Sequence, residues 1–315
     1  MARWRTLPKN NSNPPQNAHH PEAGLGLAYG IFAYLIWGVF PVYFKALKAV
    51  PPLQVVSHRI VWSMVLLVLL ISWRNCWQDI RSAMADRTSL LILLATSILI
   101  GTNWLVFIIA VEHGQILQSS LGYFINPFVS VLLGVLFLKE RMRRLQLAGL
   151  LFAAAGVIML TIRLGIFPST ALILALSFGT YGLLRKVVKV DALSGLMVET
   201  FLMVPVACGY LMFAAWRGDG VFPGAGMTTN LLLAGSGIMT AVPLLLFSAA
   251  ARRLKLATVG FLQYITPTLH FLAAVQIYKE PFTAVHLASF LLIWTGLAAY
   301  SWDAYRSLLQ ARQMG

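Results

Sequence analysis

Apolar runs separated by short polar connections recur along the chain from residue 25 to residue 302. A run of about 20 apolar residues is long enough to cross a bilayer as a helix. Because hydrocarbon offers no partners to backbone N–H and C=O groups, each such run must be helical. The pattern predicts an all-α polytopic membrane protein with ten transmembrane helices, at residues 25–44, 53–72, 89–111, 116–138, 145–163, 168–184, 194–216, 229–250, 257–278 and 284–302.

The two ends of the chain lie outside this pattern. Residues 1–24 are rich in Asn and Pro and predict a disordered cytoplasmic tail, and residues 304–315 predict a second cytoplasmic tail. The first apolar run does not predict a signal peptide, because it starts late and no small-residue cleavage site follows it.

Composition supports a membrane protein and argues against nucleic-acid binding. Hydrophobic residues make up 59% of the chain and charged residues 11%, whereas soluble domains carry about 25% charged residues. The net charge of +14 comes from short basic clusters between apolar runs. Such clusters set the orientation of a protein in a membrane, so we expect a lipid bilayer and a small-molecule substrate as partners, and no nucleic acid.

The basic residues also predict which connections face the cytoplasm. If the N-terminus is inside, most Lys and Arg residues lie on the cytoplasmic side. The exceptions are Arg59, which lies within a span, and five residues in the external connections. Positive charge accumulates on the cytoplasmic side of membrane proteins. We therefore expect both termini in the cytoplasm, with these residues outside: Lys45, Lys48, Arg163, Arg217 and Lys279.

The sequence repeats itself at an offset of 140 positions. Phe124–Pro127 falls on Tyr264–Pro267, and Gly156 falls on Gly296. The pattern predicts two repeats of five helices each, residues 25–163 and 164–303. Because five is an odd number, the repeats cross the membrane in opposite directions. Inverted repeats with interrupted helices are typical of secondary transporters, which bind substrate between the two halves.

Several motifs have a familiar form. Tyr34–Gly38, then Phe40–Lys45, His58-Arg59 and Gly122–Pro127 precede a Lys-Glu pair at Lys139-Glu140. With the five-plus-five repeat, these residues resemble the EamA branch of the drug/metabolite transporter superfamily and, more narrowly, its RarD group. The resemblance covers nearly everything after residue 24.

This resemblance implies a permease of the bacterial inner membrane. The group's name is linked to chloramphenicol sensitivity, and relatives export amino acids and other small metabolites. The resemblance therefore implies transport of small metabolites or drugs, such as amino acids or amphenicol-like compounds, by alternating access at a central cavity. Coupling to protons and a homodimer are alternatives that the sequence leaves open.

Charged residues inside the spans are the first candidates for a substrate site, because each costs about 3 kcal/mol at a helix centre. Arg59, beside His58, lies in the second predicted helix, and Glu199 lies in the seventh at the position 140 residues further on. The two charges could pair or bind the two ends of a zwitterion across a shared cavity, and Glu199 or His58 could carry protons. The alternative is that Arg59 and Glu199 each extend to the nearer membrane surface.

Two prolines mark the second group of candidates. Pro127 and Pro267 are expected to break two helices at matched places, because Pro removes a backbone donor and frees a carbonyl. Exposed backbone at membrane depth is tolerated where it lines protein or a water-filled cavity. Polar and aromatic residues near the breaks and in other helices are then expected to line the cavity: Trp37, Asn103, Tyr123, Asn126, Gln263, Tyr264 and His270.

The repeated Lys-Glu pairs indicate a structural role. Lys139-Glu140 and Lys279-Glu280 lie at helix ends, where an acidic side chain can cap the N-terminus of a helix. We expect these pairs to be structural or gating elements.

No motif in the sequence favours an enzyme over a transporter. Gly235-Ser236-Gly237 has no evident His or Asp partner, and neither a P-loop nor an HExxH pattern occurs. Cys76 and Cys208 do not have the spacing of a metal site or a disulfide framework. We expect no cofactor, no metal and no catalytic residues, with an intramembrane enzyme or a channel as the alternative function.

Overall fold

The computed structural model describes residues 23–138, 143–165, 167–254, 259 and 262–313. Within these residues every regular element is a helix. In the first half they are α1 (Ala23–Gly38), α2 (Phe40–Ala46), α3 (Pro52–Arg74), α4 (Trp77–Ala85), α5 (Arg87–Glu112), α6 (Ile116–Leu138) and α7 (Arg144–Leu164). In the second half they are α8 (Ser169–Val187), α9 (Ala192–Trp216), α10 (Met227–Arg253), α12 (Ile265–Leu272), the π-helical turn η1 (Ala273–Ile277) and α13 (Ala284–Gln313).

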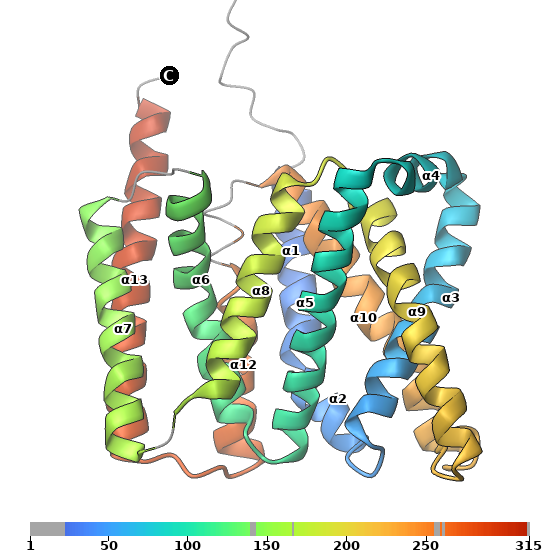
Figure 1. Cartoon of the computed structure of the whole chain (residues 1–315). Coiled ribbons are helices and arrows are strands. Elements are labelled where there is room, and N and C mark those ends of the chain that lie inside the picture. The colour runs from blue at the N-terminus through green and yellow to red at the C-terminus, as the bar shows by residue number, and fades with distance from the viewer. Residues whose placement is uncertain (1–22, 139–142, 166, 255–258, 260–261, 314–315) are drawn as a thin grey trace, which may run out of the picture.

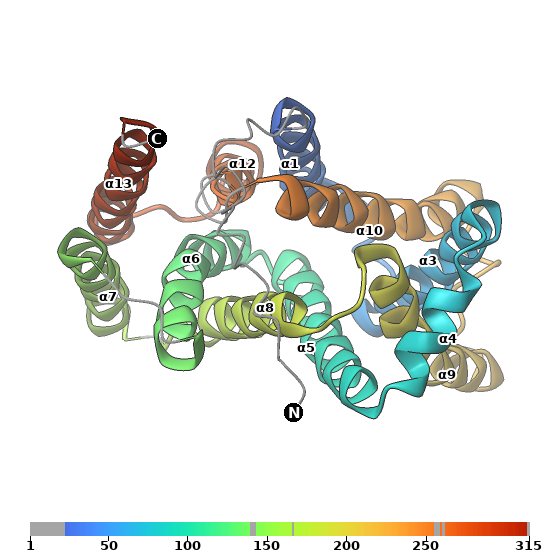
Figure 2. The same cartoon turned by 90° about the horizontal axis from the view of Figure 1, so that it is seen from above.

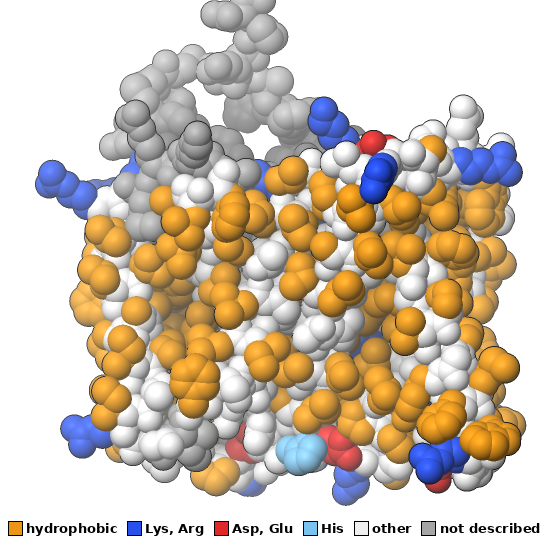
Figure 3. Space-filling view, in the orientation of Figure 1, with side chains coloured by type: hydrophobic (Ala, Val, Ile, Leu, Met, Phe, Trp, Pro, Cys, Tyr) orange, Lys and Arg blue, Asp and Glu red, His pale blue; other side chains and the backbone are white. Residues whose placement is uncertain are grey.

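Seven helical stretches of the described chain are long and apolar enough to cross a membrane, with α1 and α2 forming one of them. Two shorter apolar helices cover Ile265–Ile277 and Ala284–Ala299. Apolar side chains cover the middle of the surface in Figure 3, and Lys and Arg gather towards its two ends. The chain is therefore a helical, multi-pass membrane protein.

Two elements depart from the sequence prediction. The expected span 25–44 is divided at Val39, and α2 begins with Pro41 near its N-terminus. The short helix α4 was not predicted, because it has only nine residues and turns only Ile80 and Ala83 into the protein. Figure 1 places α4 across one end of the bundle, where it joins α3 to α5.

The prolines do not act alike. Helix α6 continues through Pro127, so the break expected there is absent. Proline removes one helical hydrogen bond, and packing of α6 against α8 holds the rest of the helix in place. Pro267 lies near the start of α12, which begins at Ile265. Pro205 and Pro243 are likewise inside continuous helices.

The packing of the helices follows the offset of 140 positions. Helix α1 packs on α10 and α12, and their counterparts pack likewise, α8 on α5 and α6. The contact of α3 with α10 has its counterpart in that of α9 with α5. Three helices of the first half begin 140 positions before a helix of the second: α3 before α9, α5 before α10 and α7 before α13.

Helices α7 and α13 form a pair at one edge of the bundle (Figure 2). A Cβ atom at Gly156 would lie 2.8 Å from the carbonyl oxygen of Ser289, and one at Gly296 would meet the carbonyl oxygen of Gly149. Gly149 and Ser289 are themselves 140 positions apart. The two close approaches are thus the same contact made twice, once from each helix.

This contact gives a first prediction. Gly156→Val and Gly296→Val should each lower the stability of the purified protein by about 1–3 kcal/mol, because the added atoms overlap a backbone carbonyl. Gly209→Ala is the control, since nothing lies within 4 Å of a Cβ there. Thermal unfolding in detergent measures all three. A stable Gly156→Val beside an unstable Gly296→Val would show that the two contacts are not equivalent.

Candidate functional site

A pocket lies inside the bundle, between helices of the first half (α1, α2, α3, α5 and α6) and of the second half (α8, α10 and α12). The space among its lining side chains is about 560 Å³ when the part open to the outside is included. Its polar lining consists of Arg59, Asn103, Tyr123, Gln263, Thr266 and His270. Its aromatic lining consists of Tyr34, Trp37, Phe40, Trp104, Phe107 and Phe178. Many candidates from the sequence therefore lie together here.

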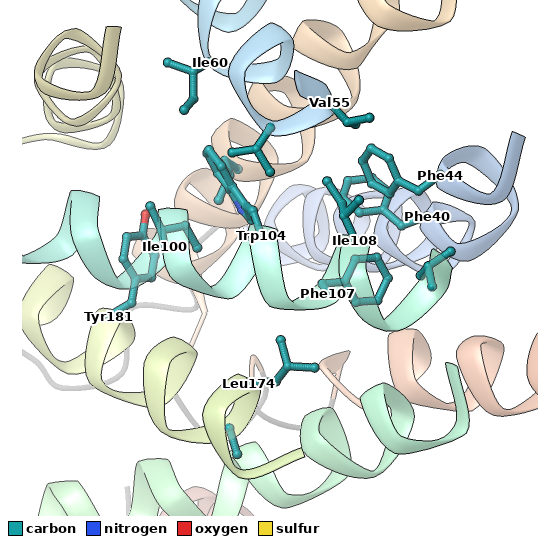
Figure 4. Close-up of a cluster of buried hydrophobic side chains, with 14 of the residues drawn as sticks. Phe40, Phe44, Val55, Ile60, Ile100, Trp104, Phe107, Ile108, Leu174 and Tyr181 are labelled. Carbon is teal, nitrogen blue, oxygen red and sulfur yellow. The ribbon is translucent and has the colours of Figure 1, made fainter. Parts of the chain in front are cut away.

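Arg59 is the one charged residue in the described lining of the pocket, and it is 1% exposed. Its Nε donates a hydrogen bond to Thr240 Oγ1 at 2.9 Å. Its guanidinium carbon lies 4.6 Å from the ring centre of Trp104 and 4.8 Å from that of Phe44. Figure 4 shows these rings among the buried side chains where α2 faces α5. Arg59 Nη1 has no hydrogen-bond partner among the described residues.

Asn103 holds three helices together at the pocket wall. Its Nδ2 donates to the carbonyl oxygen of Leu174 at 3.0 Å and to Ser177 Oγ at 2.9 Å, both on α8. Its Oδ1 accepts a hydrogen bond from the Tyr123 hydroxyl on α6 at 3.2 Å. Asn103 therefore fixes α5, α6 and α8 around the pocket, and its donors and acceptor are already occupied.

His270 connects α12 to the break between α1 and α2. In a helix, the Trp37 carbonyl would accept from the N–H four residues further on, but that residue is Pro41, which has no N–H. His270 Nε2 lies 2.9 Å from the Trp37 oxygen and donates to it. The ring stacks on Phe107 with centroids 5.3 Å apart, and Nδ1 has no hydrogen-bond partner among the described residues.

The start of α12 forms the remaining polar wall. Thr266 Oγ1 donates to the carbonyl oxygen of Tyr34 at 2.8 Å, and Ser120 Oγ donates to that of Pro267 at 2.8 Å. Gln263 Nε2 is buried and has no hydrogen-bond partner in the described part of the chain. The second half therefore adds a free amide donor to the pocket.

Glu199 lies away from this pocket, in a buried cluster of its own. It has no exposed surface. Its Oε1 accepts from Thr96 Oγ1 at 2.7 Å and lies 3.5 Å from Arg185 Nη1, and its Oε2 accepts from Tyr181 at 3.4 Å. Since Glu199 pairs with Arg185, the expected pairing with Arg59 across a shared cavity is absent. Both charges are buried, so neither reaches the membrane surface as the alternative required.

Three further candidates lie outside the lining of the pocket. His58 packs against Phe222, with ring centroids 5.3 Å apart. Asn126 of α6 is buried against Gly179 of α8. Tyr264 stacks on Phe124. These side chains support the helices around the pocket.

Glu280 caps the N-terminus of a helix, but that helix is α6 and not, as the sequence led us to expect, the next helix along the chain. Its two carboxylate oxygens accept from the backbone N–H groups of Ile116 and Leu117, at 2.9 and 2.8 Å, at the start of α6. Burial raises the pKa of Glu280, while these N–H groups and the nearby Lys45 oppose the rise. Lys45 donates to the carbonyl oxygen of Val111 at 2.9 Å. The matching pair Lys139-Glu140 lies outside the described residues.

Sequence reasoning missed Arg185, the partner of Glu199. Arg185 appeared to be one of several basic residues in a cytoplasmic connection, but it extends back towards α9 over Gly195, where a Cβ would collide with it. It also missed Thr240 and Phe44, two immediate neighbours of Arg59, because these pairings join different helices. Gly195, which leaves room for the long side chain of Arg185, was the only local signal of these pairings.

Within the described residues, no group of three His, Cys, Asp or Glu side chains is placed to hold a metal ion. Cys76 and Cys208 are both free. The pocket offers hydrogen-bond donors, aromatic faces and one guanidinium, which can bind an organic solute but present no described Ser, Cys or carboxylate as a nucleophile.

The fold and the pocket together define a multi-pass membrane protein of the transporter type. Residues 24–162 match the EamA-like transporter family. Protein RarD of Escherichia coli K12 is 43% identical over 89% of this chain and 94% of its own length. The chain belongs to the EamA-like transporter family and, within it, to the RarD group.

Other relatives agree with this assignment. An uncharacterized transporter of Vibrio cholerae is 44% identical over 93% of this chain and 97% of its own. The chloramphenicol-sensitive protein RarD of Pseudomonas aeruginosa is 32% identical over 93% of this chain and 99% of its own. One solved crystal structure aligns with a TM-score of 0.64 over 90% of this chain and 99% of its own, at 17% identity, which shows a shared fold.

Proposed function

We propose that this chain is a secondary transporter of the bacterial inner membrane that moves a small metabolite or drug by alternating access. The pocket is the observation that carries this proposal. It is built from both halves of the chain, and polar groups converge in it among apolar walls, as in small-molecule binding sites. We propose it as the substrate site, with Arg59, Asn103, Tyr123, Gln263 and His270 as its polar contacts.

The proposed architecture is ten spans in a five-plus-five inverted repeat. The matched helix contacts and the doubled glycine contact between α7 and α13 support it. The two shorter apolar helices and α8 supply the spans beyond the seven long ones. In transporters with this symmetry, substrate binds where the halves meet, and the pocket has that position.

Different polar contacts join the helices at the two ends of the bundle. At one end, Glu280 caps α6 and Lys45 holds the C-terminus of α5. At the other end, Arg185 and Glu199 join α8 to α9. Alternating access requires that one end opens while the other stays closed, and these two sets of contacts are the proposed closures.

The proposal is tested by flux into sealed proteoliposomes. Purified protein, reconstituted at known density, should carry a labelled solute from a panel of amino acids, organic acids and amphenicols faster than protein-free vesicles do. Excess unlabelled substrate on the opposite side should accelerate the exchange. Uptake that grows linearly with solute concentration and shows no saturation or exchange would instead favour a channel.

Accessibility of introduced cysteines tests the orientation. In a chain whose Cys76 and Cys208 are replaced by Ser, Thr283→Cys should react with an impermeant maleimide added outside intact cells, and Arg143→Cys should not. Thr283 and Arg143 are both exposed, so a cysteine introduced at either position should react once the cells are opened. Labelling of Arg143→Cys alone in intact cells would reverse the proposed orientation.

A further inference from the structure

The wall of the pocket carries a positive charge that the described protein does not balance. Arg59 is almost fully buried, and the contacts of its guanidinium are a neutral hydroxyl and aromatic rings. Aromatic faces attract a cation, but removing an ion from water costs several kcal/mol, and only a counter-charge with good hydrogen bonds offsets that cost fully. The free Nη1 group marks where such a counter-charge would bind.

Glu199, the acidic residue that the repeat matches to Arg59, already has a partner of its own. Glu199 stands 140 positions after Arg59 but is paired with Arg185 and is not in the lining of the pocket. The described lining contains no Asp or Glu. The described lining therefore has a formal charge of +1.

A second free donor in the pocket suits the same kind of ligand. Gln263 Nε2 is a second unpaired donor, whereas the carboxamide of Asn103 is fully used within the protein. An ammonium group entering the pocket would meet the guanidinium of Arg59 and no described carboxylate. Among the free groups of the described lining, Arg59 Nη1 and Gln263 Nε2 are donors and His270 Nδ1 is an acceptor. The two donors and the one charge favour a ligand acceptor that carries negative charge.

We propose, building on the transport function above, that the pocket selects a small organic monoanion, with a carboxylate bound by Arg59 and an aromatic or apolar body. The planar guanidinium matches the two oxygens of a carboxylate. The rings of Trp37, Phe107 and Phe178 enclose the rest of the ligand. Neutral compounds leave the charge of Arg59 unbalanced, and zwitterionic amino acids bring an ammonium group that the pocket does not pair.

Binding of three matched probes to the purified protein in detergent tests this selectivity. The probes are 3-phenylpropionate, its neutral amide 3-phenylpropionamide and the zwitterion phenylalanine, which share one ring and nearly one size. Quenching of tryptophan fluorescence reports binding, because Trp37 and Trp104 line the pocket. The carboxylate should bind about 10- to 100-fold more tightly than either of the others, the range for a hydrogen bond to a charged group.

Two variants separate a specific site from general attraction of anions. Arg59→Gln should remove the preference for the carboxylate over the amide. Arg217→Gln should keep it, although Arg217 also lies over a ring, that of Phe213, at 5.3 Å, because Arg217 is exposed. A thermal unfolding curve checks that each variant is folded.

The results distinguish this inference from the transport function. Equal binding of the three probes, no binding of any, or an unchanged preference in Arg59→Gln would overturn the inference. Saturable flux of neutral or zwitterionic solutes would then still support transport. Tight carboxylate binding without flux of any solute in proteoliposomes would support the inference and contradict the transport function.

Discussion

Arg59→Ala should reduce transport at least about 30-fold while the protein stays folded and inserted in the membrane. The guanidinium is the only charged group in the described lining of the pocket, and loss of a charge-assisted hydrogen bond to a buried ligand costs about 2–5 kcal/mol. Arg59→Lys should recover little, because an ammonium is a point charge without the planar fork of Arg. Initial rates in proteoliposomes measure the effect.

Folding has to be controlled in this experiment, since Arg59 also packs on Phe44 and Trp104. The amount of protein in the membrane and its thermal unfolding are compared with those of Arg217→Ala, which removes an exposed arginine that also lies over a ring. Wild-type rates in a folded Arg59→Ala protein would exclude Arg59 from the substrate site.

Glu199→Ala should destabilise the protein by about 3–5 kcal/mol, the usual cost of leaving one member of a buried ion pair without its partner. The side chain of Arg185 is 13% exposed, so it cannot readily regain water. Thr96 and Tyr181 also lose their acceptor. The midpoint of thermal unfolding in detergent measures the loss.

A double variant shows whether the ion pair is the cause. Arg185→Met combined with Glu199→Met removes both charges at similar volume and should be more stable than either single variant, since apolar replacement of a buried pair is often neutral. If the double variant instead loses the sum of the two single effects, the pair is not coupled and the prediction is wrong.

Glu199→Gln addresses proton coupling in the same cluster. It keeps the shape of the side chain and removes its proton site. Flux that persists but no longer responds to a pH gradient would identify Glu199 as the proton carrier, whereas an unchanged response would leave Glu199 a structural role alone.

The sequence predicted the helical class and most helix positions well, because hydrophobic length and basic connections follow directly from the bilayer. The predicted span 89–111 and the observed α5 (Arg87–Glu112) differ by two residues at most. The family, inferred from motifs such as Tyr34–Gly38, is confirmed by the relatives. Pro41 accompanies the break in the first span, whereas α6 continues through Pro127, so a proline alone does not locate a break.

The candidate site was predicted only in part. Residues close to the matched prolines, such as His270 and Gln263, do line the pocket. The repeat offset placed Arg59 and Glu199 at equivalent positions but did not show which neighbours each would have. Arg185 pairs with Glu199, while its equivalent Lys45 binds the Val111 carbonyl. The offset of 140 positions therefore matches residues in sequence without fixing the partner of each.

Because of the break at Val39, α2 is a separate short helix that extends from the pocket to the end of α5. Phe40 and Phe44 form part of the ring cluster around Arg59, and Lys45 at the far end holds the end of α5. A seven-residue helix is about 10 Å long. A rotation of about 10° at Val39 moves its far end by about 2 Å, more than the bond from Lys45 to Val111 tolerates. We therefore expect a change in the pocket to be transmitted to the proposed closure at Lys45 through the roughly two turns of α2.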